Sequence, residues 1–399
     1  MSRASIFDLL HQRQVVSEPV EEPVAIRSDY LPDRLRIIDG LALTAAGFIR
    51  SGEIPEPATP ELSSTLYGAD GYRLLVHRVG DAMSVNEPRL GRLDAKALRL
   101  HQLIQTVVIE ALMMLEVLPE ESHFDVLLST PFRSREAADI VQSRLRDAIA
   151  ETQYGACLGE VRLAPEGADP HATLAVGDQG GMPYVLWVGA DSLLNDSDVG
   201  SLRYRDLLTP TSRGGGLYPG EAVAALLLQR LTAEDAAFDS GWYLEAGIRR
   251  EHAPRATRRD HDKRQALITL LDELWPAAGS LSGADEQAGG EETASAAPSR
   301  LVVDALGLPG RAVELGGAVV ERWPDLDTVE DGLGVDALCG WSGEATRVLP
   351  FVLAVGACTP EQHALVLTLH AEQSTQAWAL ESCAAVAVAS AAQPVEAQS

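Results

Sequence analysis

The chain has 399 residues, of which 46% are hydrophobic and 23% charged, an ordinary balance for one large globular domain or two fused halves. Its 58 acidic residues exceed its 32 basic ones and give a formal net charge of −26, which argues against binding to nucleic acid or to anionic membranes. No continuous apolar run is long enough to span a bilayer, the first residues lack the apolar core of a secretory signal, and the four cysteines form no CxxC pair. We therefore expect a cytoplasmic protein without structural zinc or a disulfide framework.

The first half of the chain alternates short apolar runs with longer amphipathic ones. Residues 1–33 are weakly patterned and predict an irregular N-terminal arm, and residues 34–205 form the first folded half. Asp94 has the position of an N-cap, and Pro119 follows the last turn of the helix that it begins. We expect helices at 94–118 and 134–151, and strands at 36–42, 72–78, 124–129, 160–163 and 184–189. Such alternation is typical of an α/β sheet.

The second half, residues 206–390, repeats this order and indicates an internal structural duplication. We expect helices at 259–275 and at 345–356, the latter interrupted at Pro350, and strands at 223–228, 301–305, 364–370 and 376–380. Residues 277–299 are of low complexity and predict a mobile loop, because they bury too little apolar surface to offset their ordering entropy. Residues 391–399 form a tail.

Three segments together resemble β-ketoacyl synthases and other thiolase-fold condensing enzymes. In the first, a glycine-rich loop (Gly214, Gly215 and Gly216) leads through Pro-Gly-Glu to the buried run VAALLL. The others are YVLWVGADSLLND at 184–196 and LCGWSGEATRVLPFVLAVGAC at 338–358. The resemblance covers roughly residues 35–385. It implies a thiolase-like αβαβα layered sandwich of two pseudo-duplicated halves.

The resemblance also implies a catalytic set, which this sequence departs from. A condensing enzyme needs a thiolate to hold the acyl group and two imidazoles, or equivalents, to polarise the thioester. The segment where the family has its nucleophile, 162–181, holds no Cys and no Ser, so His171 and Thr173 are its candidates. The second position falls in 301–315, which has no His. At the third, Trp341 stands where the family has His, and an indole cannot shuttle a proton.

Cys157 is the remaining candidate nucleophile. Its context, YGACLGEVRL, is similar to an Ala-Cys-x-Gly nucleophile turn. The residues that follow are strand-like and include Pro165 and Pro170, so no long helix begins there. A small buried cysteine near the start of a strand is the alternative interpretation.

Candidate binding residues come from the glycine-rich segment and from one basic stretch. The first group comprises Gly214 to Gly216, Tyr218 and Trp341. The stretch 249–264 (RREHAPRATRRDHDKR) is a local positive feature in an acidic chain, and through Arg258 and Arg259 it could grip an acidic partner. The alternative is a solvated helix start with its own salt links. His77 is assigned to a core or edge strand, and His363 and His370 fall on opposite faces of a strand pattern, so we expect no metal site and no cofactor.

Two functions follow as expectations. The first is a catalytically inactive ketosynthase-like protein that acts by binding, as a homodimer or as a heterodimer with a related thiolase-like subunit. Such degenerate proteins resemble accessory proteins of bacterial type VI secretion, where they are thought to assemble or load effector and spike proteins. The second is an acyl-transfer enzyme with Cys157 as nucleophile, or the non-catalytic subunit of a ketosynthase heterodimer. A phosphate loop at Gly214 to Gly216 is rejected, because no P-loop Lys or Ser/Thr follows.

Overall fold

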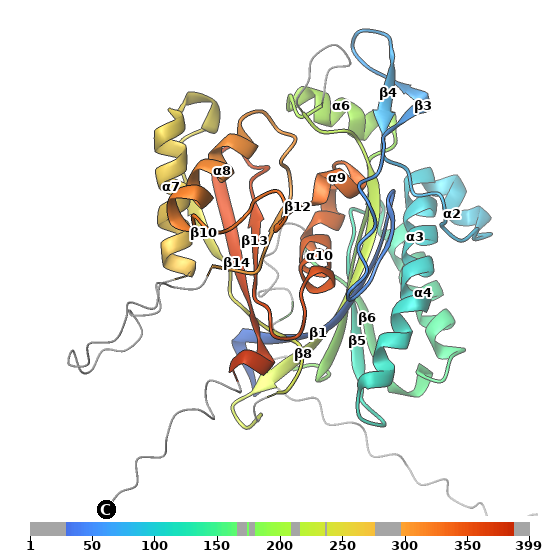
Figure 1. Cartoon of the computed structure of the whole chain (residues 1–399). Coiled ribbons are helices and arrows are strands. Elements are labelled where there is room, and N and C mark those ends of the chain that lie inside the picture. Colours follow the sequence, from blue (N-terminus) through green and yellow to red (C-terminus); the bar gives the residue numbers. More distant parts are fainter. Residues whose placement is uncertain are drawn as a thin grey trace, which may run out of the picture.

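The computed structural model describes residues 29–165, 174, 180–208, 216–235, 238–275 and 297–386. Within them, two runs of strands join into one large twisted sheet through the long first strand, β1 (Figure 1). A separate two-stranded hairpin projects from one end of the molecule; its strands are β3 (Glu61–Tyr67) and β4 (Arg73–Val76).

The first half of the sheet has the strand order β6-β5-β7-β8-β1. The strand β5 is parallel to both of its neighbours, β6 and β7. The strand β8 is antiparallel to both of its neighbours, β7 and β1. The strands are β1 (Tyr30–Thr44), β5 (Phe124–Ser129), β6 (Leu158–Leu163), β7 (Tyr184–Ser192) and β8 (Glu221–Thr232), and the short β2 (Gly47–Ile49) pairs with β1.

The second half repeats this arrangement as β12-β11-β13-β14-β9, with β14 antiparallel to both of its neighbours. In each half the third strand lies at the outer edge, followed by the second, fourth, fifth and first. This shared order confirms the expected duplication. The strands are β9 (Trp242–Glu245), β11 (Arg300–Val303), β12 (Gly332–Gly334), β13 (Ala364–Thr368) and β14 (Ser374–Ser382), and β10 (Ile248–Glu251) pairs with β14.

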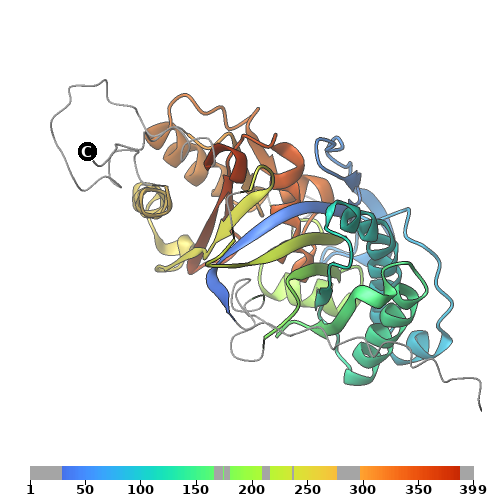
Figure 2. The ribbon, with the colours of Figure 1, turned by 90° about the horizontal axis from the view of Figure 1, so that it is seen from below.

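Helices cover both outer faces and fill the space between the two halves, which gives the αβαβα layers (Figure 1). The first outer layer holds α3 (Ala95–Ala111) and α4 (Arg135–Ala150), and the second holds α7 (Asp260–Leu274) and α8 (Arg311–Arg322). The view from below places these outer layers on opposite sides of the sheet (Figure 2). The central layer contains α10 (Leu349–Ala357), which is buried on all sides and correspondingly apolar all round.

The remaining helical segments are short and connect these elements. They are α2 (Pro88–Leu93), η1 (Leu112–Val117), η2 (Gly155–Cys157), α6 (Asp196–Tyr204), η4 (Arg255–Thr257), α9 (Val335–Cys339) and η5 (Gly343–Arg347).

Local signals in the sequence set several helix boundaries as expected. The Asp94 side chain accepts a hydrogen bond from the backbone N–H of Lys96 and so caps α3. Ser134 caps α4 in the same way, through the N–H of Ala137. The predicted interruption at Pro350 is also confirmed, because η5 ends before α10 begins and Pro350 lies in the first turn of α10.

The segment Ala95–Val117 is long and apolar enough to cross a membrane by length and composition. In this fold 61% of its most apolar stretch is buried, and α3 packs against the first-half strands β1, β7 and β8. The apolar face is thus accounted for by the protein core.

The domain boundaries expected from the sequence remain predictions. Two features of the structure bear on them. The strand β1 begins at Tyr30, inside the segment expected to be an irregular arm. The strand β8 lies between β7 and β1, so it belongs to the sheet of the first half although it follows residue 206. Most of the arm, most of the loop at 277–299 and the tail lie outside the described residues.

Candidate functional site

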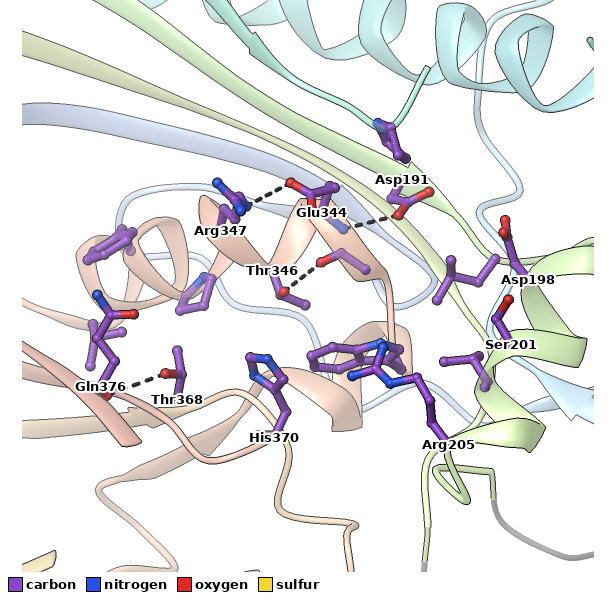
Figure 3. Close-up of a pocket in the computed structure, with 18 of the residues that line it drawn as sticks. Asp191, Asp198, Ser201, Arg205, Glu344, Thr346, Arg347, Thr368, His370 and Gln376 are labelled. Atoms are coloured by element: carbon purple, nitrogen blue, oxygen red, sulfur yellow. Dashed lines mark hydrogen bonds and ion pairs between the residues drawn. The ribbon is translucent and has the colours of Figure 1, made fainter. Parts of the chain in front are cut away.

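A cavity of about 620 Å³ lies where the two halves meet around α10 (Figure 3). Its walls come from the ends of β7 and β13, from β14, from the α6 segment and from the η5–α10 connection. This volume is in the range of small-molecule sites. Charged and polar side chains line it together with an apolar group formed by Pro350, Phe351, Val366 and Trp378.

Lys96, near the start of α3, holds two carboxylates of the cavity lining. Its Nζ lies 2.7 Å from Asp191 Oδ1 and 2.6 Å from Asp198 Oδ2. Burial raises the pKa of Asp191, and the Lys96 ammonium and the backbone N–H groups of Ser192 and Glu344 act against that rise. For Asp198, burial also acts to raise the pKa, but hydrogen bonds from Lys96 and Asn195 outweigh it and lower the pKa. The cluster therefore places one buried cation between two acids.

His370 and Asp304 form a second polar pair in the cavity wall. His370 Nδ1 lies 2.5 Å from Asp304 Oδ2, and Asp304 Oδ1 accepts the backbone N–H of Leu369 at 2.7 Å. Asp304 is buried, whereas the His370 ring lines the cavity. Because Asp304 fixes Nδ1, the imidazole leaves Nε2 for a ligand. The Trp341 ring lies 4.8 Å from the His370 ring, centroid to centroid.

The sequence analysis did not identify this pair, although a signal for it exists. Asp304 and His370 each follow the end of a strand, β11 and β13, and these strands are parallel neighbours. Polar residues just beyond the carboxyl ends of adjacent parallel strands converge at one edge of a sheet. His363 lies elsewhere, where its Nδ1 accepts the backbone N–H of Ser382 at 3.1 Å, so the two histidines do not meet.

Trp341 is held against the glycine-rich segment by backbone hydrogen bonds. Its N–H donates to the Tyr218 carbonyl at 2.7 Å, and its own carbonyl accepts from the N–H of Gly220 at 2.9 Å. A Cβ at Gly220 would lie 1.7 Å from the Cys339 carbonyl oxygen, so only glycine fits. The close backbone approach expected of the glycine-rich segment therefore occurs at Gly220.

The other members of the glycine-rich group have different locations. Gly216 has φ +118°, and its N–H donates to the Gly307 carbonyl at 2.7 Å. Gly214 and Gly215 lie outside the described residues. The Tyr218 ring lies 5.8 Å from the ring of His77, which is buried as expected.

None of the four cysteines lines the cavity. Burial raises the pKa of Cys339 to about 12 and that of Cys358 to about 11, and it also raises the pKa of Cys383. Cys157 is half-buried at the start of β6 and packs with the core on the α4 side of the sheet. The carboxyl end of β6 lies roughly 20 Å from Cys157, because the six residues of the strand rise by about 3.3 Å each. His171 lies outside the described residues.

Most cations of the basic stretch form ion pairs. Arg249 pairs with Glu251, Arg250 with Glu273, Lys263 with Asp260, and Arg264 with Glu321. Arg255 is buried against Glu314. The Arg258 guanidinium donates to the Asp262 carbonyl at 2.6 Å, and Arg259 is exposed just before α7. Two of these pairs lie within the stretch, as the alternative interpretation expects, and the other three join it to α7 and α8. Partner binding by Arg258 and Arg259 stays a prediction.

Among the described residues, no group of three His, Cys, Asp or Glu side chains is placed to hold a metal ion. What the cavity offers is a set of hydrogen-bonding and charged groups beside an aromatic wall. Phe351 and Trp378 form that wall, with their rings edge to face at 5.3 Å.

No family model matches the chain, and no curated protein matches it in sequence. Solved structures do match in fold. The ishigamide ketosynthase/chain length factor has a TM-score of 0.52 at 14% identity, over 88% of this chain and 99% of that one. A ketosynthase from module 6 of the bacillaene synthase of Bacillus subtilis 168 has a TM-score of 0.52 at 12% identity, over 88% of this chain and 72% of that one. The PfaC keto synthase-chain length factor has a TM-score of 0.51 at 11% identity, over 90% of this chain and 44% of that one. The chain thus has the thiolase-like fold of ketosynthases.

Proposed function

We propose that this protein is a non-condensing ketosynthase-like protein that acts by binding. The observation that carries the proposal is that none of the four cysteines of the chain lines the cavity where the two halves meet. A condensing enzyme must hold its acyl group on a nucleophile beside the cavity in which the acyl chain reacts. The segment 162–181 supplies neither Cys nor Ser for that purpose.

The electrostatics of the thiols support the same proposal. At pH 7 a thiol with a pKa of about 12, such as Cys339, is ionised in about one molecule in 10⁵. Cys358 and Cys383 are buried and their pKa values are raised in the same direction. Cys157 is half-buried, but it lies at the opposite end of β6 from the carboxyl ends of the parallel strands.

The residue in place of a family histidine is also unsuited to proton transfer. Trp341 is buried, and its backbone is fixed on both sides by Tyr218 and Gly220. An indole N–H is a donor only, so it cannot act as a general base. His370 is the imidazole of this cavity, and it comes from a different loop.

A partner subunit is part of the proposal. The strand β6 is the last strand of the sheet at its end of the described fold, and one edge of it has no strand partner there. Such an edge can pair with a strand from another chain. A second copy or a related thiolase-like subunit is the occupant we propose, and the fold match to ketosynthase/chain length factor structures supports the related subunit.

A second candidate function follows from the same matches. The chain would then be the non-catalytic subunit of a ketosynthase heterodimer and would shape an acyl cavity for a catalytic partner. The binding function proposed first can also be stated more specifically. The protein would then assemble or load secreted effector or spike proteins, as the type VI secretion accessory proteins that the sequence resembles are thought to do. Co-expression with a candidate ketosynthase, and separately with a candidate effector, distinguishes these two by which complex elutes as one species.

The central proposal is tested by intact mass spectrometry after incubation with a panel of acyl-CoA and acyl-carrier thioesters. The expected result is no mass gain with any donor, for the wild type and for Cys157→Ala alike. An acyl mass gain that is absent from Cys157→Ala would establish an acyl-transfer enzyme with Cys157 as nucleophile, and a gain present in both proteins would establish another nucleophile. Either result overturns the proposal.

A further inference from the structure

The charges around the cavity are unevenly matched. Its lining includes three carboxylates, and three cations pair with them. Lys96 holds Asp191 and Asp198, Arg133 from outside the cavity lies 2.8 Å from Asp198, and Arg347 Nε lies 2.7 Å from Glu344. A further lining cation, Arg249, pairs with Glu251. The carboxylates of the cavity are thus already neutralised and do not select a cationic ligand.

Arg205 is the lining cation with no ion pair or hydrogen bond from its guanidinium to any residue that the structure describes. It is the C-cap residue of α6, and its side chain lines the same cavity as His370 (Figure 3). A guanidinium with five N–H donors matches a carboxylate in a bidentate arrangement. Within the part of the chain that the structure describes, the cavity therefore offers one uncompensated positive charge.

Aromatic side chains also line the cavity. Phe351 and Trp378 lie edge to face at 5.3 Å, and Trp341 lies against His370 at 4.8 Å. The Trp378 side chain is buried, and its Nε1 packs against Gly247. Aromatic side chains favour a planar ring through offset or edge-to-face contacts.

We propose that this cavity binds, without a covalent bond, a small planar aromatic molecule that carries one carboxylate. The ring lies between the Trp378–Phe351 wall and the Trp341–His370 pair, and the carboxylate faces Arg205. His370 Nε2, oriented by Asp304, supplies a second polar contact. The inference rests on the proposed non-condensing function, because a cavity without a nucleophile keeps its ligand by contacts alone.

The test uses 2-naphthoate as the probe and isothermal titration calorimetry on the full chain. The neutral isostere 2-naphthalenemethanol tests the charge, and decanoate tests the ring. Arg205→Gln removes the uncompensated cation and Arg205→Lys keeps it. Arg203→Gln is the matched control, because Arg203 is on the same helix but its guanidinium donates to the Tyr67 carbonyl at 2.8 Å and does not line the cavity.

The expected result is saturable binding of 2-naphthoate that weakens about tenfold in Arg205→Gln, recovers most of its strength in Arg205→Lys and is unchanged in Arg203→Gln. Binding of 2-naphthalenemethanol is expected to be insensitive to all three substitutions. No binding of 2-naphthoate up to about 1 mM, equal binding by wild type and Arg205→Gln, or equal or tighter binding of decanoate would each overturn the inference.

These outcomes are independent of the test of the proposed function. A covalent acyl adduct in the mass experiment would overturn the non-condensing function whatever the calorimetry shows. Absence of 2-naphthoate binding, with no adduct from any thioester, would overturn only the ligand class.

Discussion

Replacing Lys96 by methionine should destabilise the protein strongly, because Lys96 neutralises two carboxylates inside the fold. Its Nζ lies within 2.7 Å of both Asp191 and Asp198, and the Lys96 side chain is only 6% exposed. Methionine has a similar length and fills the space of the alkyl chain, so the change removes mainly the charge. Removal of one partner from a buried ion pair costs about 3–5 kcal/mol. Asp198 keeps Arg133 at 2.8 Å, so most of the cost arises at Asp191.

The size of this loss should depend on pH. Burial already raises the pKa of Asp191 in the native state, and loss of Lys96 raises it further. Between the unfolded and the folded pKa of this carboxyl, the native state holds a proton that the unfolded state lacks, so stability falls as pH rises through that window. The difference between wild type and Lys96→Met should therefore be larger at pH 8 than at pH 5.

The assay is urea unfolding followed by far-ultraviolet circular dichroism at both pH values. Arg89→Met is the control at the surface, since Arg89 (68% exposed) pairs with Glu136 (49% exposed), and such a pair contributes about 0–1 kcal/mol. A loss below about 1 kcal/mol in Lys96→Met, or a loss that shrinks from pH 5 to pH 8, would refute the reasoning.

Three further predictions concern other parts of the fold. Gly220→Ala should lower the free energy of unfolding by about 1–3 kcal/mol, because its Cβ would lie 1.7 Å from the Cys339 carbonyl oxygen. Gly200→Ala in α6 is the control and should be neutral or stabilising, because nothing lies within 4 Å of the added Cβ. Equal effects of the two substitutions in urea unfolding would contradict this account. Iodoacetamide should modify Cys157 alone in the native protein, since the other three thiols are buried and have raised pKa values. Peptide mass mapping that finds Cys339 modified as fast as Cys157 would contradict this prediction. Burial lowers the pKa of His77 and of His101 below 6.5. As pH falls through 6.5 the unfolded state therefore takes up protons that the native state does not, and the free energy of unfolding should drop between pH 7 and pH 5. The drop in urea unfolding should be smaller in His101→Phe than in wild type, and identical pH profiles of the two proteins would argue against this account.

Much of the fold could be predicted from local patterns. The cap at Asp94, the cap at Ser134 and the helix break at Pro350 each depend on a few neighbouring residues, and the structure has all three. The buried strand β7 was visible as a continuous apolar run for the same reason. The duplication was expected from the repeated alternation of elements, whereas the strand order that the two halves share became visible only in the structure.

The cavity was harder to predict because its parts come from distant segments. Lys96 reads as an ordinary helix residue until the fold brings β7 and α6 beside it. The Asp304–His370 pair depends on which strands are parallel neighbours, and that topology is not contained in either segment alone. The resemblance to condensing enzymes directed attention to Trp341, which does line the cavity, but the imidazole beside it is supplied by another loop.

The central claim is that the cavity performs no acyl chemistry, and release of free thiol from acyl-CoA donors tests it most directly. With the purified protein in the presence of each donor of a panel, a colorimetric thiol assay should show no release above the protein-free rate. Release that grows in proportion to protein concentration and is lost in Cys157→Ala or in His370→Ala would contradict the account, and the variant that abolishes it would identify the group responsible.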